Sequence, residues 1–263
     1  MAMPAQAAGT VILEGSDSIG FHSRNPGAAA NYRDQTFSAL GGASSKKIAV
    51  VGRTSFGGPV TSGTHAIATF DDLSMASATL SDYVAIYFLA NGGCCSSGPG
   101  YIAGRQTDLS AYVNGGGTVE IGDYDGNSGW DFLTGGTGNN AFVGGVSGAL
   151  AGPSCSDGET VTADGIANGF TQPGPIGCFT HQGYSMAHFA TLGFTKSFFN
   201  SDPLFASLNP GFGPFSSLLS NGNTITGGGN GVPEPASWAL MLVGFGAVGS
   251  LLRSSRKRVA LTA

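Results

Sequence analysis

The sequence predicts an α/β domain with a mainly parallel β-sheet, followed by a Gly-rich linker and one C-terminal transmembrane helix. Residues 47–52, KIAVVG, are almost continuously apolar, as is typical of a strand buried on both faces of a parallel sheet. Residues 82–122 carry a strand pattern, a Gly-rich loop, a helix pattern, three glycines and a second strand pattern. This order predicts a βαβ unit with a right-handed crossover. Residues 236–252 contain no charged side chain.

The individual elements follow from hydrophobic periodicity and from glycine breaks. The helix at 28–40 is predicted because Ala29, Tyr32 and Phe37 lie roughly along one face and Gly41 follows. Residues 64–75 fit either a helix or a strand, with the helix favoured. The other predicted elements are strands at 10–14, 82–90 and 118–122, short strands within 159–170 and 177–194, a helix at 107–114 and a helical turn at 202–208.

These elements predict one exported α/β domain over residues 8–208 and a flexible Gly/Pro/Asn/Ser linker over 209–231. The chain has 263 residues, of which 10% are charged and 41% are apolar, so it can bury a sizeable core. Its net charge is −5, and four of its eleven cations lie near the C-terminus. The absence of a basic patch upstream excludes nucleic acid as an expected partner.

The C-terminal segment predicts a membrane span. The uncharged run of residues 236–252 has the length of a short span, since about 17–25 residues are needed. The cations that follow it place the C-terminus in the cytoplasm by the positive-inside rule. The stop-transfer residues are Arg253, Arg256, Lys257 and Arg258.

The residues Pro233, Glu234, Pro235 and Trp238, with the apolar run and the basic cluster, resemble the PEP-CTERM sorting signal over Val232–Arg258. That family belongs to Gram-negative, exopolysaccharide-producing bacteria. The resemblance implies a membrane peptidase of the exosortase type as partner. It also implies passage through the inner membrane, then a place at the cell surface or outside the cell, in a polysaccharide-rich biofilm setting.

Two further features agree with export. Ala5-Gln6-Ala7 reads like the end of a signal peptide, so we expect a signal to precede it. Four cysteines fit an oxidising compartment, and adjacent Cys94 and Cys95 are poorly placed to bond to each other. We expect each of them to pair with one of Cys155 and Cys178.

Residues 47–208 resemble the class I glutamine-amidotransferase-like fold, which also hosts ThuA-like domains. The resemblance implies a flavodoxin-like three-layer sandwich. It rests on the strand at 82–88, Ser97-Gly-Pro-Gly100, Gly115-Gly-Gly-Thr-Val119, Gly165–Phe170 and Asp202–Phe205. Where active members carry a G-x-C-x-G elbow, this chain has Gly122-Asp-Tyr-Asp-Gly126, with Tyr124 in the place of the cysteine. The resemblance therefore implies a non-catalytic binding domain.

The alternative is a secreted hydrolase that uses His181, near where such folds carry a catalytic histidine. It requires a nearby serine or cysteine as the nucleophile. The serine candidates are Ser96, Ser97 and Ser185, none of which lies in a G-x-S-x-G elbow. We favour the binding domain.

Asp123, Asp125, Asn127 and Asp131 form a D-x-D-x-N-x-x-x-D pattern. Alternating oxygen ligands in a Gly-rich loop are typical of Ca²⁺ sites, so calcium is the one cofactor considered. A turn that uses Asp and Asn for its hydrogen bonds is the alternative. A third interpretation is a sugar site in which Tyr124 and Trp130 stack on the rings. No H-x-x-x-H pair or His/carboxylate cluster is visible in the sequence, so no zinc site is expected.

Overall fold

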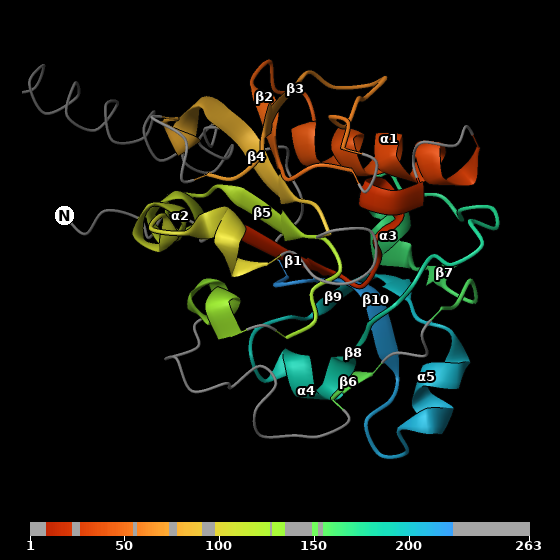
Figure 1. The fold of residues 1–263 in the computed structure, drawn as a ribbon. Helices are drawn as coiled ribbons and strands as arrows, with labels where there is room; N and C mark the ends of the chain where they lie inside the picture. The colour runs from red at the N-terminus through yellow and green to blue at the C-terminus, as the bar shows by residue number, and fades with distance from the viewer. Residues whose placement is uncertain are drawn as a thin grey trace, which may run out of the picture. The chain divides into compact units, whose positions relative to one another are not determined.

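The computed structural model describes residues 9–22, 27–54, 57–73, 78–90, 98–126, 128–134, 149–151 and 155–222 (Figure 1). The chain divides into two units, residues 1–228 and 229–263, and all described residues belong to the first. No helix among the described residues is long and apolar enough to cross a bilayer. The predicted transmembrane helix at 236–252 lies outside the described residues.

Within the described residues, ten strands form one mixed sheet. The path β3-β2-β4-β5-β1-β10-β8-β6 runs edge to edge, while β9 pairs with β10 and β7 pairs with β9. The strands are β1 (Thr10–Glu14), β2 (Lys47–Val51), β3 (Ile67–Phe70), β4 (Tyr83–Phe88), β5 (Thr118–Ile121), β6 (Leu150–Ala151), β7 (Thr160–Val161), β8 (Gly183–Ser185), β9 (Lys196–Asn200) and β10 (Phe215–Ser220).

One half of the sheet is parallel. Strands β3, β2, β4, β5 and β1 pair in parallel in that order. Counted from β2, the first four have the order 2-1-3-4 of flavodoxin-like sheets, and β1 takes the place of the fifth strand. The predicted βαβ unit is confirmed, because α2 (Gln106–Asn114) connects the parallel neighbours β4 and β5. The α/β class is therefore confirmed.

The other half of the sheet is antiparallel and begins with β10 beside β1. All six residues of β10 are buried. This strand lies inside residues 209–231, so the prediction of a linker is wrong for residues 215–220, and the domain extends beyond residue 208. The strand sequence FSSLLS carries only three apolar residues, and its burial comes from pairing with β1 on one edge and β9 on the other.

A second prediction fails at residues 64–75, where a helix was favoured. Residues 67–70 form β3 instead, which pairs in parallel with β2. The strand lies at the edge of the sheet and is only partly buried. Its sequence therefore lacks the continuous apolar run of a central strand, and its pairing with β2 decides its conformation.

Helices cover both faces of the sheet, so the domain has three layers (Figure 1). On one face, Tyr32 and Phe37 of α1 (Ala28–Gly41) pack in one core with Ile48 of β2. On the other face, Leu109 of α2 packs in a second core with Val119 of β5. The remaining helical elements are η1 (Ser18–His22), η2 (Leu80–Asp82), η3 (Pro99–Ile102), η4 (Ser128–Thr134), α3 (Ala163–Ala167), α4 (Met186–Ala190) and α5 (Pro203–Leu208).

Candidate functional site

Three segments meet at the carboxyl ends of β1 and β5. The loop after β1 lies beside residues 181–182, because the amides of His181 and Gln182 both donate to the carbonyl of Gly15, at 2.7 and 3.0 Å. The turn after β5 joins the same loop, because the amide of Asp123 donates to the carbonyl of Ser16 at 3.0 Å. In open α/β sheets this edge is where ligands bind.

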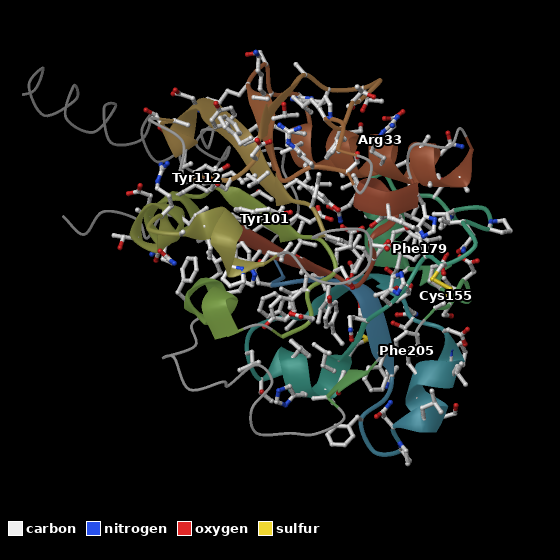
Figure 2. All side chains as sticks on the ribbon, in the orientation of Figure 1. Arg33, Tyr101, Tyr112, Cys155, Phe179 and Phe205 are labelled. Carbon is white, nitrogen blue, oxygen red and sulfur yellow. A yellow bond between two sulfur atoms is a disulfide. The ribbon has the colours of Figure 1, made fainter. Side chains whose placement is uncertain are left out.

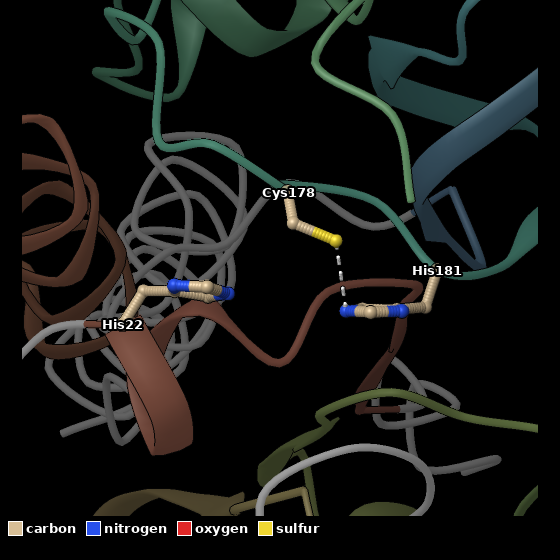
Figure 3. Close-up of side chains that lie close together, drawn as sticks. All are labelled: His22, Cys178 and His181. Atoms are coloured by element: carbon tan, nitrogen blue, oxygen red, sulfur yellow. Dashed lines mark hydrogen bonds between the residues drawn. The ribbon is translucent and has the colours of Figure 1, made fainter. Parts of the chain in front are cut away.

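Two histidines converge on a buried carboxylate at this edge. Oδ1 of Asp17 lies 3.3 Å from Nε2 of His181 and 3.6 Å from Nε2 of His22. The side chain of Asp17 is 1% exposed, whereas that of His22 is 20% exposed, so the group opens to solvent on the side of His22. Figure 3 shows the rings of His22 and His181 with Cys178 beside them. We call Asp17, His22 and His181 the His–Asp cluster.

The local fold explains why Asp17 and His22 meet. Element η1 is a π-helical turn, in which hydrogen bonds span five residues rather than four. Such a turn brings the chain from Asp17 back to His22. The ring of Phe21 contacts the ring of His22 edge-on, with centroids 4.7 Å apart.

Cys178 lies next to the His–Asp cluster, with its Sγ 3.5 Å from Nε2 of His181. Cys178 forms a disulfide with Cys155 (Figure 2). The expected pairing of these two cysteines with Cys94 and Cys95 is therefore wrong. The isolated bridge between Ser156 and Thr180 places the segments of Cys155 and Cys178 side by side, which no spacing in the sequence indicates. Cys94 and Cys95 lie outside the described residues.

A buried carboxyl group of β1 lies beneath this site. The hydroxyl of Tyr32 donates to Oε1 of Glu14 at 2.6 Å, and the hydroxyl of Tyr87 donates to Oε2. Burial raises the pKa of Glu14 to about 8, and the nearby Asp123 and Asp17 carboxylates act in the same direction. The two tyrosine hydrogen bonds oppose this shift of the pKa. Glu14 therefore carries a proton at neutral pH.

A second buried carboxyl group, Glu120 of β5, lies near Glu14. Burial raises its pKa well above the ordinary value, and the Glu14 carboxylate raises it further. Neither oxygen of Glu120 has a hydrogen-bond partner among the described residues. Neither glutamate stands out in the sequence, because each is one polar position in an apolar strand.

The predicted calcium loop is only partly described. Asp123 is fully buried and has a left-handed backbone with φ of 47°, while Asp125 is half-buried. The side chains of Asn127 and Asp131 lie outside the described residues. Calcium binding there stays a prediction.

The aromatic residues proposed to stack on sugar rings do not line a surface. Trp130 is 0% exposed and Tyr124 is 1% exposed, and both belong to the core beside α2. Trp130 packs edge-on against Phe88 of β4, with ring centroids 4.8 Å apart. The sugar-stacking interpretation of these two residues is wrong, because their apolar surface is used in the core.

The serine proposed to work with His181 has another role. Ser185 is buried, and its hydroxyl caps α4 by accepting from the amide of His188. Ser96 and Ser97 lie outside the described residues. Cys178 is therefore the described candidate nucleophile within reach of His181, and it is held in the disulfide.

The expectation that no His/carboxylate cluster exists is wrong. Asp17 and His22 read as ordinary polar residues of a loop, and His181 lies far from them along the chain. Their spacing of five residues fits no common helical ligand pair, because an α-helix places residues three and four apart on one face. The π-helical turn and the contact of residues 181–182 with Gly15 bring the three side chains together.

We expect Gly15→Ala to destabilise the domain, because the new Cβ would lie 1.9 Å from the carbonyl oxygen of Gln182. Separating these segments should lower the free energy of unfolding by about 1–3 kcal/mol, as measured by urea denaturation. Gly100→Ala is the matched control, since no atom lies within 4 Å of its added Cβ. Equal stability of the two variants would contradict this contact.

The predicted sorting and stop-transfer residues lie outside the described residues, so their assignment rests on comparison with known proteins. Residues 231–257 match the PEP-CTERM protein-sorting motif, in agreement with the resemblance of this segment. Searches of curated proteins and of solved structures gave no significant match. The resemblance of residues 47–208 to amidotransferase-like folds stays a prediction.

Proposed function

We propose that the α/β domain is a non-catalytic binding module, displayed at the cell surface or in the extracellular matrix. The PEP-CTERM protein-sorting motif at residues 231–257, which marks an exported protein processed by an exosortase, supports this role. The ligand of the domain binds at the carboxyl edge of the sheet, around the His–Asp cluster. The flavodoxin-like order of the parallel strands supports this location.

The observation that carries this proposal is the orientation of His181. In a catalytic triad, one ring nitrogen of the histidine faces the nucleophile and the other is held by an acid. Here the same ring nitrogen, Nε2 of His181, lies 3.5 Å from Sγ of Cys178 and 3.3 Å from Oδ1 of Asp17. This arrangement does not orient the ring as a base, and the sulfur is engaged in a disulfide.

One observation favours a hydrolase as the second candidate. Cys178 lies within reach of His181, so reduction of the disulfide would free a thiol beside an imidazole. Turnover of ester or amide substrates by the reduced chain, lost in both Cys178→Ser and His181→Gln, would establish this alternative. We expect no turnover by either redox form.

Two ligands are proposed for the binding module. Calcium is proposed at Asp123, Asp125, Asn127 and Asp131, since carboxylate and amide oxygens are its preferred ligands. A polysaccharide is proposed because the sorting motif resembles those of exopolysaccharide-producing bacteria. Any sugar contact would use polar side chains, since Tyr124 and Trp130 are buried.

We expect the protein on the outer surface of its host to have lost the C-terminal segment. Its intact mass should correspond to cleavage near Pro233–Pro235, and this product should disappear when the sorting peptidase is deleted. The reason is that the motif occupies residues 231–257. A full-length mass in both strains would contradict processing and leave the segment as a plain anchor.

A further inference from the structure

We infer that Asp17, His22 and His181 bind a zinc ion. This inference deepens the binding role proposed above by naming an inorganic ligand. The three side chains come from the loop after β1 and from the segment before β8. They offer two imidazole nitrogens and one carboxylate oxygen, which zinc accepts as a ligand set.

The two distances from Asp17 lie closer to those of a tetrahedral ion than to those of an octahedral one. Zinc bonds of 2.0–2.2 Å in tetrahedral geometry separate neighbouring nitrogen and oxygen ligands by about 3.4 Å. An octahedral ion with bonds near 2.1 Å would separate them by about 3.0 Å. The observed distances from Oδ1 of Asp17 to the two Nε2 atoms are 3.3 and 3.6 Å, which surround the tetrahedral value.

The carboxylate of Asp17 lacks the hydrogen bonds that a buried charge needs. Neither of its oxygens has a hydrogen-bond partner among the described residues, and the side chain is 1% exposed. Nε2 of His181 lies 3.3 Å from Oδ1 of Asp17, but the two atoms are not aligned for a hydrogen bond. An unbonded buried carboxylate is costly, and coordination of a cation removes that cost.

Cys178 lies at the same place but is not assigned as a ligand. The ligand atoms of His22, His181 and Cys178 lie within 4.8 Å of one another (Figure 3). The disulfide deprives Cys178 of thiolate charge, so we assign three protein ligands and leave the fourth position open. The open position lies on the partly exposed side of His22, where an oxygen or nitrogen donor of a binding partner can coordinate.

The test uses the untagged full-length chain, freed of metal by a chelator and titrated with zinc chloride. We expect one equivalent of zinc to bind and to raise the Tm. Asp17→Asn, His22→Gln and His181→Gln should each weaken binding by more than about 100-fold. His65→Gln is the matched control, because His65 hydrogen-bonds the carbonyl of Lys46 at the opposite edge of the sheet.

Asp17→Asn separates loss of the ion from loss of the fold. In the metal-free chain this variant should keep the Tm, because asparagine has the shape of aspartate and neither oxygen of Asp17 has a hydrogen bond to lose among the described residues. In zinc, it should lose the increase in Tm that the unsubstituted chain shows. A titration with calcium tests the specificity of the site. Any change in Tm that calcium causes should be the same in all three ligand variants and in the unsubstituted chain.

Failure to bind zinc in the micromolar range would overturn the site and leave a plain imidazole–carboxylate group. Equal zinc binding by His22→Gln, His181→Gln and His65→Gln would also overturn it. Neither outcome affects the mass of the sorted protein, so the site can fail while the sorting function stands.

Discussion

The free energy of unfolding is expected to fall as the pH rises from about 4.5 to 8, and Glu14→Gln is expected to remove a large part of this fall. Burial raises the pKa of Glu14 from 4.5 to about 8 in the folded chain. The folded state therefore binds this proton more tightly than the unfolded state. Its stabilising effect is complete below pH 4.5 and is lost as the pH rises through 8.

The size of this effect follows from the difference between the two pKa values. Each unit corresponds to about 1.4 kcal/mol, so Glu14 contributes at most about 5 kcal/mol over this range. Glu159 acts in the same direction with a smaller effect, because burial raises its pKa to about 7. Urea denaturation at several pH values measures the slope of the free energy of unfolding.

Glutamine is the appropriate replacement because it is neutral and has the shape of the protonated carboxyl group. It keeps an oxygen for one tyrosine hydroxyl, from either Tyr32 or Tyr87. The double variant Glu14→Gln/Glu120→Gln should reduce the pH dependence of the free energy of unfolding further, since the pKa of Glu120 is also raised. Parallel stability curves for Glu14→Gln and the unsubstituted chain would show that Glu14 is ionised in the folded state.

Trp130→Ala is expected to lower the free energy of unfolding by about 3–5 kcal/mol. The ring is fully buried and packs against Phe88 in the core beside α2. Removing it leaves a cavity that the rigid βαβ unit around it fills only in part. Urea denaturation measures this loss, and Leu208→Ala is the control, because the side chain of Leu208 is 57% exposed.

A milder substitution of the same residue, Trp130→Phe, tests the position of a sugar site. If Trp130→Phe folds with most of the stability, its affinity for host polysaccharide should equal that of the unsubstituted chain. Loss of polysaccharide affinity without loss of stability would place the indole at a binding surface and contradict its role in the core.

The elements that sequence reasoning predicted correctly depend on neighbours in the chain. The strand at 10–14, the helix that begins at Ala28 and the βαβ unit of β4, α2 and β5 each carry a periodic apolar pattern ended by glycine. The sorting motif is also local, because recognition by a peptidase and insertion into a membrane depend on one continuous segment. Its match at residues 231–257 confirms what the order of motif, apolar run and cations indicates.

The features that sequence reasoning missed depend on residues far apart in the chain. Strand β10 has a weak apolar pattern and exists because β1 and β9 supply its hydrogen-bond partners. The bond between Cys155 and Cys178 follows from the bridge between their segments.

The His–Asp cluster has the same origin. It needs a π-helical turn after β1 and a contact of Gly15 with residues 181–182, and neither leaves a periodic signal. Local patterns thus identify the parallel half of the sheet and the sorting motif of the protein. The arrangement of its polar site follows from long-range packing, which places Asp17 in a buried position beside two histidines.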